Sequence, residues 1–145
     1  MSGGHVTAHW RPPHAYVPGQ TRRHPEDLFD PLKQIAQPLE RSPAFVHGLR
    51  MLREGYFWEA HECLEPVWMA APANSGEKLM VQGVIQLANA RLKAVMGKSN
   101  AEARLRAEAR RLMSEAFARA GAPVLGLTEK DTAQMLQEST ANYAK

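Results

Sequence analysis

Residues 77–96 read EKLMVQGVIQLANARLKAVM and are followed by Gly97. On a helical wheel, the apolar side chains of this stretch cover most of the circumference, and glycine commonly ends a helix. A helix that is apolar on nearly all sides lies in the interior of a globular protein. The stretch therefore predicts a central, buried helix. Four of its polar residues share one stripe about 60° wide on the wheel, made of Gln82, Gln86, Asn89 and Lys93.

Helix signals continue on both sides of this stretch. Ser42 and Pro43 suit the N-cap and first turn of a helix, and Gly55 suits its end. Pro66 lies within the next helical pattern, where it predicts a kink or an early end. The chain has neither a glycine-rich phosphate loop nor strand–helix alternation, so we predict an all-α, single-domain bundle of about five helices. The other expected helices cover residues 42–55, 56–68, 99–120 and 128–143.

Length and composition favour one domain without a membrane segment. The chain has 145 residues, 44% of them hydrophobic, which is enough for one sizeable core. Cys63 is its single cysteine, so no internal disulfide can form, and we expect a cytoplasmic protein. No apolar stretch approaches the length of a membrane span. Residues 1–23, rich in proline, glycine and histidine, predict an irregular or mobile arm before a helical domain over residues 24–145. A segment without fixed geometry is a poor metal site, although it contains His5, His9 and His14.

The formal net charge of +3 is mild and comes largely from arginines in residues 104–119. Acidic residues interrupt them, and the spacing predicts surface ion pairs one helical turn apart. We therefore expect a solvated helix face and no nucleic-acid partner. The expected pairs are Glu102 with Arg106 and Glu115 with Arg119.

A polar cluster interrupts the second helix. Residues 55–68 read GYFWEAHECLEPVW, with two tryptophans, one histidine and three glutamates. Four of these side chains fall within a sector of about 100° on a helical wheel, namely Trp58, His61, Glu62 and Glu65. Ordinary amphipathic helices expose mainly lysine and glutamate to water. A sector of tryptophan, histidine and glutamate therefore predicts a functional site. Cys63 falls on the opposite, apolar side, where we expect a small hydrophobic residue instead of a nucleophile.

The carboxamides of residues 77–96 need partners if that helix is buried. An unmatched buried amide costs on the order of 1–3 kcal/mol. We therefore expect the two polar groups to face each other. At least two side chains from each group should lie within hydrogen-bonding or single-water distance. The first group is Gln82, Gln86 and Asn89, and the second is His61, Glu62 and Glu65.

Two blocks carry a family resemblance, GYFWEAHECLEPVW at 55–68 and QGVIQLANA at 82–90. They resemble the Domain of Unknown Function 309 family. His24 and Pro25 are similar to the family's opening, so the resemblance spans residues 24–97. It implies a small helical bundle that draws these polar residues together. It implies no activity, because the family is named for lacking one.

The cluster is compatible with two kinds of function. His61 and Glu65 could bind one cation with Glu62 as a base, as in zinc proteases, but the motif lacks a third ligand, which His24 or His47 would have to supply. Metal-free acid–base chemistry on a small polar ligand is the alternative, and no cofactor is indicated. In the second class, the protein is a non-catalytic helical module whose cluster is a structural network, and such a module could form a homodimer or another homo-oligomer. The candidate catalytic residues are His61, Glu62 and Glu65, and the candidate ligand-binding residues are Trp58, Trp68, Gln82, Gln86 and Asn89.

Overall fold

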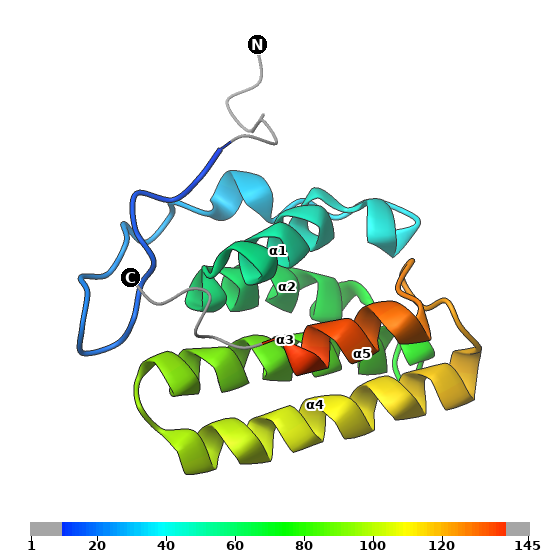
Figure 1. Cartoon of the computed structure of the whole chain (residues 1–145). Coiled ribbons are helices and arrows are strands. Elements are labelled where there is room, and N and C mark those ends of the chain that lie inside the picture. Colours follow the sequence, from blue (N-terminus) through cyan, green and yellow to red (C-terminus); the bar gives the residue numbers. More distant parts are fainter. Residues whose placement is uncertain (1–9, 139–145) are drawn as a thin grey trace.

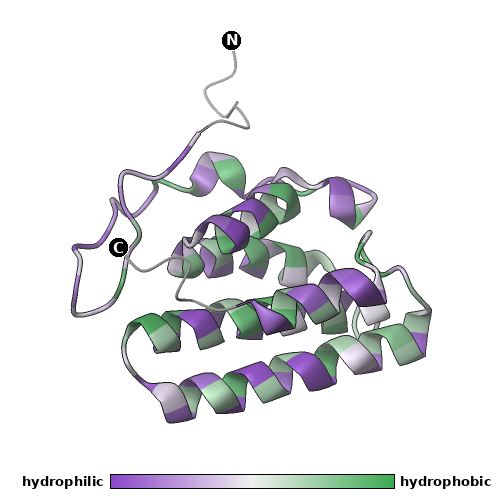
Figure 2. Ribbon diagram, in the orientation of Figure 1, coloured by the Kyte–Doolittle hydropathy of each residue, from purple (hydrophilic) through white to green (hydrophobic). Residues whose placement is uncertain are grey.

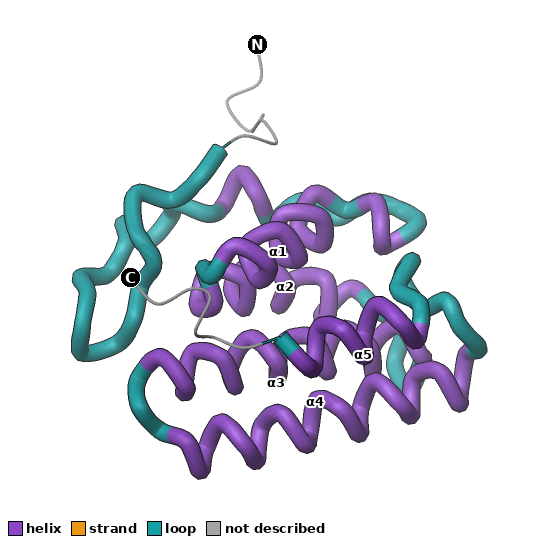
Figure 3. The backbone as a smooth tube through the Cα atoms, viewed as in Figure 1, coloured by secondary structure: helices purple, strands orange, loops and turns teal. Residues whose placement is uncertain are grey.

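The computed structural model describes residues 10–138, and this part of the chain is a helical bundle (Figure 1). Loops connect the helices, and no strand occurs in this range (Figure 3). The predicted all-α fold is therefore confirmed. The helices are α1 (Pro43–Glu54), α2 (Phe57–Ala70), α3 (Gly76–Val95), α4 (Ser99–Ala120) and α5 (Glu129–Gln137), and two 3-10 turns, η1 (Asp30–Leu32) and η2 (Leu39–Arg41), precede them.

Helix α3 lies at the centre of the bundle. It packs against α2 on one side and against α4 on the other (Figure 1). Ser75 caps its start, because the Ser75 hydroxyl accepts a hydrogen bond from the Lys78 N–H at 3.0 Å. Glycines in α3 let α4 approach closely: a methyl group on Gly83 would lie 2.9 Å from Met113 Cγ. Its fully buried apolar residues include Met80, Val81, Val84, Ala88 and Ala90.

Helix α2 does not end at Pro66 but continues to Ala70. The early end that proline predicted is therefore not observed. The apolar side of α2 faces the core, where Cys63 is fully buried. Burial raises the pKa of the Cys63 thiol to about 12, so the thiol stays protonated and unreactive.

Helix α5 is shorter than the sequence predicted. A capping box starts it, because the Thr128 side chain and Asp131 each accept a hydrogen bond from the other's backbone N–H. It ends at Gln137, with Glu138 in an extended conformation. The rest of the predicted helix, towards Tyr143, lies outside the described residues.

Helix α4 covers one side of α3 and has a polar outer face (Figure 2). Both predicted ion pairs form there, Glu102 with Arg106 at 2.9 Å and Glu115 with Arg119 at 3.3 Å. Pairs of this exposure stabilise a helix by only a few tenths of a kcal/mol each, ~0.3–0.5. These charged side chains make the face of α4 polar and add little to the stability of the fold.

Residues 10–24 form an irregular segment, which we call the N-terminal strap (Figure 3). Arg11 binds the Glu54 carboxylate at 2.8 Å, at the end of α1. The Tyr16 backbone N–H donates to Glu59 at 2.7 Å, and His24 contacts the same carboxylate at 2.6 Å. These contacts hold the strap against α1 and α2.

None of the described helices is long and apolar enough to cross a membrane.

Candidate functional site

A hollow of about 380 Å³ opens on the protein surface between α2 and α3. We call it the α2–α3 hollow. It lies at the small end of the range for ligand pockets, about 300–1,000 Å³. Helix α2 contributes His61, Glu65, Trp68 and Met69 to its lining, and α3 contributes Gln82, Ile85, Gln86 and Asn89. Six of the eight candidate site residues therefore line one hollow.

Helical periodicity explains why these side chains meet. His61 and Glu65 are one turn apart on α2, and Gln82, Gln86 and Asn89 follow the i, i+4, i+7 pattern along one face of α3. The two helices pack against each other, which brings both stripes to the same seam.

His61 and Glu65 contact each other across one helical turn. His61 Nε2 lies 3.2 Å from Glu65 Oε2, and the two side chains are 30% and 57% exposed. Water screens a pair of this exposure, so its contribution to stability is at most about 1 kcal/mol. A histidine oriented by a carboxylate is also the usual arrangement of a general base.

The three carboxamides are only partly buried. The Asn89 amide donates to Gln86 Oε1 at 3.3 Å, so this bond joins amide to amide and does not reach the carboxylates. Among the described residues, no direct hydrogen bond joins these amides to His61 or Glu65, and the two groups share a hollow. The physical reason is exposure: amides that reach water do not require protein partners. Contact through a single water stays a prediction.

Trp68 lines the hollow and contacts Lys78. The Lys78 ammonium lies 3.9 Å from the centre of the indole ring and donates to the Trp68 carbonyl at 2.8 Å. The indole N–H of Trp68 is buried and has no hydrogen-bond partner within the described part of the chain.

Two candidate residues lie elsewhere. The Glu62 carboxylate lies 3.6 Å from Lys33 Nζ, on the side of η1. Trp58 packs edge-on against Tyr16 of the strap, with ring centres 5.2 Å apart. The 100° sector is wide enough to face two neighbours: His61 and Glu65 occupy one half, about 40° apart. Trp58 and Glu62 occupy the other half and do not line the hollow.

The family comparison agrees with the resemblance carried by the two sequence blocks. The family model described as Domain of unknown function (DUF309) matches residues 45–105. Residues 45–105, less than half of the chain, are therefore similar to the DUF309 family. The match begins in α1 and runs into α4, so His24 and Pro25 fall outside it, whereas the whole α2–α3 hollow falls inside. No curated protein and no solved structure matches the chain.

A second polar group in the DUF309 segment was missed by the sequence reasoning. Glu59 is fully buried, and its Oε2 atom accepts the two strap hydrogen bonds. The His24 ring packs against Phe29 and Trp58, with ring centres 5.0 and 6.0 Å away. Glu59 Oε1 and His24 Nδ1 lack partners among residues 10–138. The available signal was the position of Glu59 beside the apolar face of α2, where a carboxylate needs a partner.

The histidines proposed as further metal ligands are engaged elsewhere. His24 contacts Glu59, the Nδ1 atom of His47 lies 2.7 Å from Arg50, and His14 bonds to the Arg22 carbonyl. Over residues 10–138, no group of three histidine, cysteine, aspartate or glutamate side chains could hold a metal ion. His5 and His9 lie outside the described residues.

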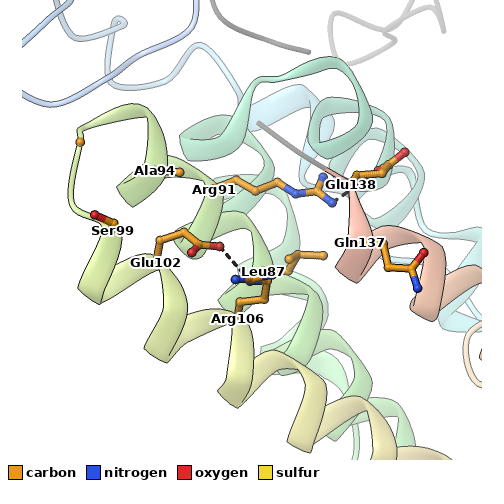
Figure 4. Close-up of a pocket in the computed structure, with 9 residues that line it drawn as sticks. Leu87, Arg91, Ala94, Ser99, Glu102, Arg106, Gln137 and Glu138 are labelled. Carbon is orange, nitrogen blue, oxygen red and sulfur yellow. Dashed lines mark hydrogen bonds and ion pairs between the residues drawn. The ribbon is translucent and has the colours of Figure 1, made fainter. Parts of the chain in front are cut away.

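Another hollow of about 380 Å³ lies where α3 ends, α4 begins and α5 ends (Figure 4). Arg91 points towards Glu138 and bonds to the Met135 carbonyl, and Glu102 pairs with Arg106. The charges that line this hollow are therefore neutralised by one another. It offers no group with the acid–base geometry of His61 and Glu65.

Proposed function

We propose that the protein binds a small polar ligand in the α2–α3 hollow. The observation that carries this proposal is the partial exposure of a concentrated set of donors and acceptors. His61, Glu65 and three carboxamides line one concave surface, and none of them is fully buried. Groups that served only to fix the two helices would be enclosed and mutually satisfied.

The lining chemistry limits the class of ligand. Carboxamides both donate and accept hydrogen bonds, and Glu65 and His61 add an acceptor and a titratable group. Neither lysine nor arginine lines this hollow. A phosphate or other strong anion would lack its usual partners. The hollow therefore suits an uncharged or cationic polar ligand, with Trp68 and Ile85 contacting its apolar parts.

Catalysis is a weaker candidate than binding. His61 beside Glu65 could act as a general base on a bound ligand. However, Glu62 pairs with Lys33 outside the hollow, and Cys63 is a buried, protonated thiol. The rival assignment, an interaction module with a purely structural cluster, requires that removal of these side chains destabilise the fold.

A crystallographic fragment screen tests the proposal. Crystals would be soaked in a library of uncharged and cationic polar fragments, with an anionic set as the control. We expect bound fragments within hydrogen-bonding distance of Gln86 or Asn89. Fragments that bind only in other hollows, or only anionic ones in this hollow, would contradict the proposal.

A further inference from the structure

The carboxamides of the α2–α3 hollow have a regular spacing. Gln82, Gln86 and Asn89 occupy one face of α3 and line the same hollow. A helix rises 1.5 Å per residue, so their Cα atoms are spaced along the axis by about 6.0 and 4.5 Å. The whole row, which we call the carboxamide ladder, spans about 10.5 Å along α3.

The first step of the ladder is close to the repeat of an extended polypeptide, and the second step is shorter. An extended chain rises about 3.3 Å per residue, so groups that point the same way recur every ~6.6 Å. The first step of the ladder is about 0.6 Å shorter than this repeat and the second about 2.1 Å shorter. The flexible side chains of the ladder have to absorb both differences. Three residues of extended chain cover about 10 Å, the length of the ladder.

The chemistry of the ladder matches a peptide main chain. A carboxamide has the same donor and acceptor as a peptide group and can bond to both its N–H and its C=O. The hydrogen bond that the Asn89 amide donates to Gln86 Oε1 is long, 3.3 Å, and lies at a partly exposed site. Exchange of this bond for bonds to a peptide therefore costs little.

Apolar side chains flank the ladder. Met69 is 70% exposed at the rim, and Trp68 and Ile85 line the hollow beside it. Successive side chains of an extended peptide point to opposite sides, so every second residue could contact this apolar border. A flexible methionine adapts to side chains of different shape.

We infer that the carboxamide ladder binds the main chain of an extended peptide segment of about three residues. This inference rests on the proposed function and names the ligand class of the same hollow. Recognition through the main chain is largely independent of peptide sequence. Contacts between the apolar border of the hollow and every second peptide side chain provide a preference for peptides with apolar residues at alternate positions.

Titration of ¹⁵N-labelled protein tests the inference. The first probe is a mixed library of hexapeptides with acetylated N-termini and amidated C-termini, and the second is maltotriose, an uncharged ligand without peptide groups. We expect the peptides to shift the side-chain amide signals of Gln82, Gln86 and Asn89. A tight-binding member would then be made with one central amide replaced by an ester. Loss of that N–H should weaken binding about fivefold to tenfold.

Variants separate the ladder from the rest of the surface. Gln86→Ala should weaken binding of the peptide about tenfold, whereas Gln134→Ala, which removes an exposed carboxamide from α5, should leave the affinity unchanged. Equal affinity of the ester and amide peptides would overturn the inference. Shifts with maltotriose but not with peptides would overturn it too, while the proposed function would stand. Shifts with neither probe, together with an empty hollow in the fragment screen, would overturn both.

Discussion

Glu59 is the residue on which the attachment of the N-terminal strap depends most. Its carboxylate is fully buried and binds both the Tyr16 N–H and His24. Removal of one member of such a group leaves the others buried without a partner.

We predict that Glu59→Ala lowers the free energy of unfolding by about 3 kcal/mol. Glu65→Ala, on the same helix, is the matched control, because the Glu65 side chain is 57% exposed and its pair with His61 contributes at most ~1 kcal/mol. Urea denaturation measures both. Similar small losses for the two variants would contradict the assigned role of Glu59.

His47 should make stability depend on pH. Burial, and then the positive charges of Arg50 and Arg11, lowers the pKa of His47 below its usual 6.5. The folded protein therefore binds fewer protons than the unfolded chain, and stability falls as the pH drops from about 6.5 through the lowered value.

His47→Gln keeps an acceptor for Arg50 and removes the titration. Between about pH 7 and pH 5, the free energy of unfolding of this variant should fall less than that of the natural protein. Denaturant titrations at several pH values measure the difference. Parallel pH profiles would show that His47 does not titrate differently on folding.

At the level of the helices, close packing between α1 and α2 depends on Gly48. A methyl group there would lie 2.7 Å from the Cγ and Cδ2 atoms of Leu64, which is fully buried and cannot move aside. Overpacking typically costs about 1–3 kcal/mol, which outweighs the gain of ~1 kcal/mol in helix propensity. We predict that Gly48→Ala is destabilising, as measured by thermal unfolding. Ser114→Ala, at an exposed position of α4, should stay within about 0.5 kcal/mol of the natural protein, and a stabilised Gly48 variant would refute the argument.

The central position of α3 gives a second prediction at this scale. Ala88 is fully buried, so Ala88→Asp places an unpaired charge in the core and should cost at least about 3 kcal/mol. Asn89→Asp adds the same charge one position later, at the partly exposed hollow, and should cost far less. Chemical denaturation compares the two. A loss below about 1 kcal/mol for Ala88→Asp would mean that α3 is peripheral.

Individual helices show which features of the fold and the candidate site local sequence signals could predict. The ends of α1 were predictable, because Pro43 and Gly55 act locally. The Ser42 side chain makes no capping hydrogen bond to α1 and bonds to the Ala36 backbone instead. The length of α2 was not, because the packing of Val67 in the core sustains the helix beyond Pro66. In the candidate site, periodicity alone brought His61 and Glu65 together. The strap contacts of Glu59 join residues more than 30 positions apart in sequence, which no local pattern predicts.

For the whole molecule, self-association stays a prediction. The exposed apolar side chains include Val46 at 52% and Ile35 at 40% exposure. Light scattering at increasing concentration would detect a dimer. A monomer at high micromolar concentration would count against it.

The central claim for the whole molecule is that the polar residues between α2 and α3 form a binding surface and not a structural network. The free energy of unfolding of His61→Ala tests this claim without knowledge of the ligand. Because His61 is 30% exposed and pairs with a more exposed glutamate, we predict a loss below about 1 kcal/mol. A loss of about 2 kcal/mol or more would contradict the claim, because it would mark His61 as part of a network that holds the two helices together.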